Sequence, residues 1–172
     1  MKIGINVRLG IAAGSINCIA WYAFAKKLGF YSIDVYIYRN YVTLAVLILG
    51  VFLSVFLTKR KNKSFLEFKE GLKTGVLYSI VLACILGIFN YIYYTYITPD
   101  TIDYFLSEAK KSAIAHHLSE ADLTKFLAGE KSNFSSFKLI PPIIFFGLIS
   151  SLLAASAFQK KNPANPISEN EN

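Results

Sequence analysis

The chain has 172 residues, enough for one domain, and 54% of them are apolar while only 17% are charged. A soluble domain is about 25% charged, so a chain this apolar, with its apolar residues gathered in four long runs, is not an ordinary soluble protein. The net charge of +7 would favour nucleic acid as the partner of a soluble protein. Here the basic residues flank apolar runs, so we expect anionic lipid headgroups as partners and no nucleic acid.

The first apolar run, residues 9–25, is predicted to be a helix that crosses the membrane. A cleavable signal peptide is the alternative, because Lys2 and Arg8 precede the run and small residues end it. Lys26 and Lys27 follow at once, which favours a helix that is retained in the mature protein.

The second apolar run, residues 41–58, is the second predicted span, and residues 26–40 are predicted to be a short outer connection before it. Residues 59–63 then form a cluster of four basic side chains around one asparagine. Because basic loops stay in the cytoplasm, this cluster predicts that both termini are cytoplasmic. It is also where we expect contact with anionic headgroups.

The third run, residues 71–97, is the longest, and we expect the other spans to pack around it. Small residues recur along it at every fourth position, and we call them the small-residue stripe: Gly71, Gly75, Ser79, Ala83 and Gly87. Such spacing puts them on one face, where another helix backbone can come close. Ser64 followed by Glu67 predicts a capping box, with the helix starting at Phe65.

Residues 98–138 form a polar segment that is too long for a loop without structure of its own. A threonine and a proline before Asp100 predict the start of one helix. Ser119 with Asp122 predicts the start of a second helix, which ends at Gly129. The apolar side of each helix is narrow, so we expect both to lie on the outer leaflet or over the mouth of the bundle.

The last run, residues 139–158, is the fourth predicted span, and the tail at 162–172 is predicted to be disordered in the cytoplasm. Small residues with the same spacing are predicted to face the small-residue stripe: Gly147, Ser151 and Ala155. The sequence therefore predicts an all-α fold: an integral membrane four-helix bundle in a single domain, residues 1–161. Its extracytoplasmic amphipathic helical segment lies between the third and fourth spans.

Few polar groups lie inside the predicted spans. Asn17 and Asn90 are expected to bond to neighbouring helices, because an amide in lipid needs a partner. A polar path that they line together with Tyr78 is the alternative. Cys18 and Cys84 form no metal motif and are expected to be buried.

The sequence predicts no catalytic, cofactor-binding or metal-ligating residues, and hence no enzyme. His116 and His117 are the only histidines, and neighbours on a helix point about 100° apart, so we expect both to be solvated rather than to share a metal. The predicted spans contain no carboxylate for a proton relay. A lipid-modifying enzyme would need polar side chains clustered near the outer surface, for instance around Asp100, Asp103 and His116.

Three short motifs carry a resemblance to a known family: Phe68-x-Glu70-Gly71-x-Lys73-x-Gly75, Tyr91-Ile92-Tyr93 and Ile97-x-Pro99-Asp100. With the order of the spans and the two lysines that end the last one, they resemble the Bacteroidota membrane-protein family known as domain of unknown function 4199. The similarity covers nearly the whole chain. It implies a four-helix protein of the bacterial inner membrane, and it implies no activity and no functional residues.

We expect a non-enzymatic accessory or assembly component that acts through helix contacts, with further copies of itself or with other membrane proteins. The alternative is a small transporter or channel with a polar path near Asn17, Asn90 and Tyr78. A water-accessible cavity that reaches these residues would favour the transporter, and a closed bundle with small residues at the crossings would favour the accessory component.

Overall fold

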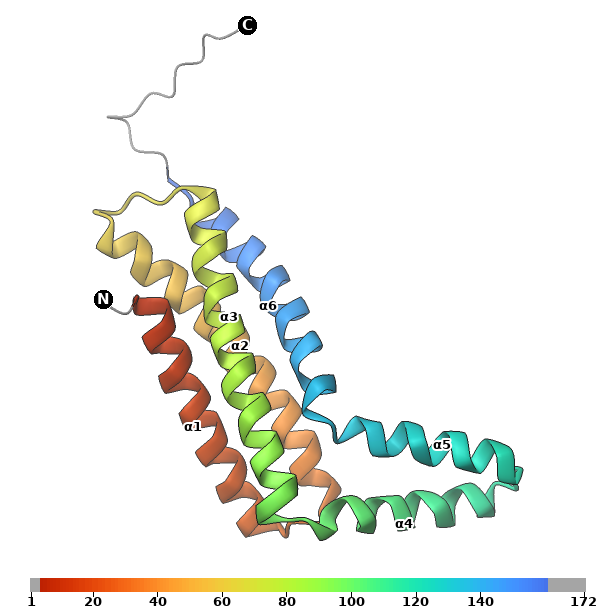
Figure 1. Cartoon of the computed structure of the whole chain (residues 1–172). Coiled ribbons are helices and arrows are strands. Elements are labelled where there is room, and N and C mark those ends of the chain that lie inside the picture. Colours follow the sequence, from red (N-terminus) through yellow and green to blue (C-terminus); the bar gives the residue numbers. More distant parts are fainter. Residues whose placement is uncertain (1–3, 161–172) are drawn as a thin grey trace, which may run out of the picture.

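Four long helices run side by side as a bundle, and a helical hairpin leaves it at one end (Figure 1). The structure is a computed structural model that describes residues 4–160, apart from the side chains of residues 33, 36, 136 and 137. The bundle helices are α1 (Ile5–Leu28), α2 (Ile33–Lys61), α3 (Phe68–Ile92) and α6 (Ser136–Phe158), and a π-helical turn, η1 (Tyr93–Ile97), continues α3. The hairpin consists of α4 (Asp100–Ala115) and α5 (Glu120–Asn133).

All four bundle helices are long and apolar enough to cross a membrane, which needs about 20 residues. The predicted all-α fold with four candidate spans is confirmed, and the chain is a membrane protein. We call the end from which α4 and α5 leave the hairpin end. The start of α1, the α2–α3 loop and the end of α6 lie at the other end, the terminal end (Figure 1). The tail predicted at 162–172 lies outside the described residues.

Helix α2 begins eight residues before the predicted span, so the prediction of a connection up to residue 40 is wrong. The Ser32 hydroxyl caps the helix by accepting a hydrogen bond from the Asp34 amide at 3.2 Å. Asp34 also places a negative charge in the first turn, where the helix dipole stabilises it. The connection between α1 and α2 is therefore a tight turn, which starts at Gly29 with a φ of 94°.

Helix α3 begins at Phe68, so the predicted start at Phe65 and the capping box are wrong. Glu67 is the N-cap residue, and its side chain forms no cap bond. The reason lies in the contact with the end of α6: the Leu66 amide donates to the Lys160 carbonyl at 3.0 Å, and the Lys160 amide donates back at 2.9 Å. This bridge holds the chain extended just before α3.

The two hairpin helices begin close to where the sequence predicts. Ser119 caps α5 by accepting a hydrogen bond from the Asp122 amide at 3.3 Å, which confirms the predicted start. The predicted end at Gly129 is wrong, because α5 continues to Asn133. A glycine ends a helix only where the chain needs a positive φ, and Gly129 has none.

The small-residue stripe packs against α6, as predicted. A Cβ at position 71 would lie 3.1 Å from the Cβ of Ala155, and one at position 75 would lie 2.8 Å from the Cβ of Ser151. One step further, a Cβ at position 147 would lie 2.5 Å from the Cβ of Ser79. Each step of four along α3 thus matches a step of four back along α6, and only small side chains permit this approach.

Glycines also allow α1 and α2 to pack closely on α3. Gly10 lies against Val81, and Gly14 lies against Ile85. Gly50 of α2 faces the hydroxyl of Tyr78, which is fully buried. Helix α3 is therefore the helix around which the other three are arranged.

The two cysteines do not share one environment. Cys18 is buried, as predicted, in the apolar core that Leu47, Leu82 and Leu86 also form. The prediction for Cys84 is wrong, because its side chain is exposed on the surface of the bundle. Hydropathy alone does not tell which face of an apolar helix points to the lipid.

Candidate functional site

The buried polar side chains of the spans form hydrogen bonds between helices. The Asn17 amide donates to the Thr43 hydroxyl at 2.9 Å and so joins α1 to α2. The Tyr78 hydroxyl donates to the Val46 carbonyl at 3.0 Å and joins α3 to α2. These bonds confirm the predicted role of Asn17 in helix packing, because each partner belongs to a neighbouring helix.

Asn90 has two roles. Its amide donates to the Phe134 carbonyl at 3.2 Å, which ties α3 to the end of the hairpin. The same side chain lies on the wall of a cavity between α2, α3 and α6. Of the three residues named for a polar path, Asn90 alone lines this cavity. Asn17 reaches it only through its bond to Thr43, which is a lining residue, and Tyr78 bonds to the Val46 carbonyl.

The cavity has a volume of about 380 Å³, within the range of small-molecule sites. We call it the α2–α6 cavity. Its polar wall lies at the hairpin end and consists of Arg39, Asn40, Thr43, Asn90, Asn133 and Lys138. Its apolar wall consists of Leu44, Leu47, Leu139, Pro142, Ile143 and Phe146. The cavity is therefore cationic at one end and apolar toward the middle of the bundle.

Arg39 is the most unusual member of the polar wall, because a charged side chain is rare in a spanning helix. It is only 7% exposed, so it points into the bundle and not toward lipid. Its Nη1 donates to the Tyr94 hydroxyl at 3.2 Å, and its Nε donates to the Asn40 side-chain oxygen at 3.2 Å. The guanidinium also lies 5.1 Å from the centre of the Trp21 ring, a cation–π distance. These contacts fix the position of the charge at the hairpin end.

Arg39 was not predicted as a site residue, because residues 26–40 were expected to form a connection between spans. In the structure, buried residues recur at every fourth position of α2: Val35, Arg39, Thr43, Leu47, Val51 and Val55. Extending the apolar series of the span backward by two steps reaches Arg39.

Lys138 supplies the second cation of the polar wall, from the first turn of α6. Its Nζ donates to the Asn133 side-chain oxygen at 3.2 Å, and the Asn133 amide approaches Glu130 at 3.5 Å. Among the described residues that line the cavity, none is a carboxylate, so Glu130 is an indirect neighbour. The charge of the lining is therefore positive.

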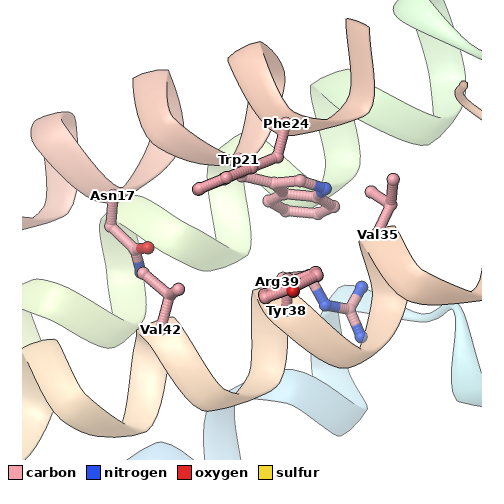
Figure 2. Close-up of a pocket in the computed structure, with 7 residues that line it drawn as sticks. All are labelled: Asn17, Trp21, Phe24, Val35, Tyr38, Arg39 and Val42. Atoms are coloured by element: carbon pink, nitrogen blue, oxygen red, sulfur yellow. The ribbon is translucent and has the colours of Figure 1, made fainter. Parts of the chain in front are cut away.

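A second hollow lies between α1 and α2 on the other side of Arg39 (Figure 2). Asn17, Trp21 and Tyr38 are among the side chains that line it. It leaves no space for a water molecule.

The polar residues of the hairpin do not gather into a catalytic or metal site in the described part of the chain. Asp100 and Asp103 lie in the first turn of α4, whereas His116 caps its other end, about 20–24 Å away at 1.5 Å per residue. His116 and His117 are both exposed, as predicted. No group of three metal-binding side chains occurs among residues 4–160.

Comparison with known proteins gives one match. No curated protein and no solved structure matches the chain. A family model described as Protein of unknown function (DUF4199) matches residues 8–160, which is most of the chain. This match confirms the family that the three motifs indicate. The chain therefore belongs to the DUF4199 family.

Proposed function

We propose that this protein is a non-enzymatic accessory component of the bacterial inner membrane, which acts through helix contacts with another membrane protein. The observation that carries the proposal is the hairpin of α4 and α5, which runs sideways away from the bundle (Figure 1). Helix α5 has no buried residue. A short helix that packs so little gains little stability from the fold, so its surface is available to a partner.

The contacts within the bundle support the same role. The small residues of α3 pack against those of α6. The two serines at this contact bond within their own helices: Ser79 of α3 donates to the Gly75 carbonyl, and Ser151 of α6 donates to the Gly147 carbonyl. An apolar core that includes Val51, Tyr78 and Leu82 joins the bundle helices. A bundle held in this way is a rigid support for the hairpin.

For the orientation we propose that both termini face the cytoplasm. The basic cluster at 59–63 lies at the terminal end, and its cations are available to anionic headgroups of the inner leaflet. Alkaline phosphatase fused within the α4–α5 turn should be active, and a fluorescent protein fused after residue 172 should fluoresce. The opposite pattern would contradict this orientation.

Photo-crosslinking in native membranes tests the proposed contact. A photoreactive amino acid at Phe126, on the exposed side of α5, should give one discrete adduct with a membrane protein that mass spectrometry identifies. The matched control is Leu153, which is exposed on α6 and should label lipid. The proposal fails when Phe126 yields the same products as Leu153. An adduct of twice 19.2 kDa would identify a second copy as the partner.

A small transporter or channel is the second candidate, and the α2–α6 cavity that reaches Asn90 favours it. A path across the bundle has to continue past Leu47 toward the terminal end. Cysteine scanning along α2 separates the two candidates: a channel predicts labelling from water at Val51 and Val55, whereas the accessory role predicts that labelling stops at Leu47. Val51 and Val55 are fully buried in the core.

A further inference from the structure

We propose that the α2–α6 cavity binds one anionic phospholipid, with its phosphate at Arg39 and Lys138 and an acyl chain along the apolar wall. This inference goes beyond the accessory role and does not depend on it. It rests on three observations: the charges of the lining, the direction in which its polarity changes, and the exposure of its outer side.

The charges select an anion. Arg39 contributes a positive charge from α2 and Lys138 contributes one from α6, and the lining also includes the amides of Asn40, Asn90 and Asn133. Guanidinium and ammonium groups are the usual ligands of phosphate oxygens, and side-chain amides add N–H donors. Arg39 is held in place by Tyr94 and Trp21, so the positive charge is fixed where a phosphate would lie.

The polarity of the cavity changes in the same direction as in one leaflet of a bilayer. On α2 the lining changes from the charged Arg39 to the apolar Leu47, and on α6 it changes from the charged Lys138 to the apolar Phe146. Each interval is eight residues, about 12 Å along a helix. Both cations thus lie at the hairpin end, at headgroup level, and both apolar walls run toward the middle of the membrane. A free phosphate ion would use the cations and leave the apolar wall empty.

The outer side of the cavity meets the surrounding lipid. Pro142 and Phe146 line the cavity and are also exposed on the surface of α6, at the depth of the acyl chains. Leu44 of α2 borders the cavity opposite them and is half-buried. A lipid therefore reaches the cavity sideways between α2 and α6 without leaving its leaflet.

Native mass spectrometry of the full chain in neutral detergent tests the proposal, with phosphatidylglycerol and phosphatidylcholine of identical acyl chains as probes. We expect one phosphatidylglycerol to be retained per chain, and Lys138→Glu to weaken its retention about tenfold. Lys125→Glu, the same change on an exposed part of α5, should leave retention unchanged. Equal retention of both lipids, or equal effects of the two substitutions, would overturn the proposal.

Two further measurements separate the lipid from a free anion. Leu44→Trp fills the apolar part of the cavity without changing a charge and should abolish retention of phosphatidylglycerol. Leu49→Trp places the same side chain on the outward face of α2 and should leave retention unchanged. Phosphatidylglycerol should raise the Tm of the protein in detergent, because a ligand stabilises the state that it binds. If inorganic phosphate alone raises the Tm equally, or Leu44→Trp still retains the lipid, the acyl-chain site is refuted.

Discussion

Gly75 shows why single residues decide how close α3 and α6 can come. A side chain at this position would collide with Ser151 on one side and with Val51, 3.1 Å away, on the other. We expect Gly75→Val to lower the free energy of unfolding by about 2 kcal/mol, the usual cost of overpacking a core. Reversible unfolding in mixed detergent micelles measures this loss.

Gly129 is the matched control for that experiment. It also lies inside a helix, but nothing lies within 4 Å of a Cβ at this position. Gly129→Ala should therefore raise the free energy of unfolding of α5 by up to about 1 kcal/mol, because alanine loses less backbone entropy than glycine. Similar losses at positions 75 and 129 would contradict the packing account.

The hydrogen bond between Asn17 and Thr43 gives a second prediction for residues. In a double-mutant cycle with Asn17→Ala and Thr43→Val, we expect an interaction energy of about 0.6 kcal/mol, the average for such bonds in membrane proteins. Asn17→Ala combined with Ser15→Ala, whose side chain is exposed, should be additive. Additive effects in the Asn17–Thr43 cycle would show that this bond contributes no stability.

Residue type predicted some of these contacts and missed others. Asn17 and Asn90 were predictable as partners of other helices, because an amide cannot stay unbonded in an apolar interior. Arg39 and Cys84 were not placed correctly. Whether such a side chain points inward depends on where its helix begins and on which face meets a neighbour, and both follow from tertiary packing.

At the scale of elements, the hairpin gives the clearest prediction. Ser119→Ala removes the cap of α5, which costs about 1 kcal/mol. Because α5 buries no residue, we expect the loss to stay local, with hydrogen exchange of the α5 amides about fivefold faster and exchange in the bundle unchanged. Ser112→Ala in the last turn of α4 is the control, and it should alter neither. Faster exchange throughout the bundle would show that hairpin and bundle unfold together.

Hydropathy predicts which segments form the spanning helices better than it predicts where these helices begin. The four spans were predictable, because a membrane core demands about 20 apolar residues in each. Their ends were less so: α2 begins at a serine cap outside the apolar run, and the start of α3 is set by the bridge from Leu66 to Lys160. The π-helical turn η1 was not predicted, because its residues continue the apolar run of α3 without a break.

At the scale of the whole molecule, the register of α3 against α6 was predictable and the α2–α6 cavity was not. When two antiparallel helices each carry small residues at every fourth position, few registers place those residues opposite one another. The cavity, in contrast, takes Arg39, Asn90, Asn133 and Lys138 from four different helices. These four residues come together because the hairpin brings the chain back to the start of α6, and no local sequence pattern predicts the path of the hairpin.

The central claim is that α3 crosses the membrane with its small-residue stripe against α6. Disulfide trapping in native membranes tests it most directly, in a chain whose two natural cysteines are replaced by alanine. The pair Gly71→Cys with Ala155→Cys should cross-link readily. The Cβ atoms would lie 3.1 Å apart, close to the separation of about 3.5–4.5 Å in a disulfide.

The control pair, Lys73→Cys with Ala157→Cys, has the same separation in sequence, but both side chains are exposed. If the small-residue stripe faces α6, the pair at 71 and 155 forms a disulfide on mild oxidation while the control pair stays reduced. A disulfide in the control pair with none between positions 71 and 155 would contradict it.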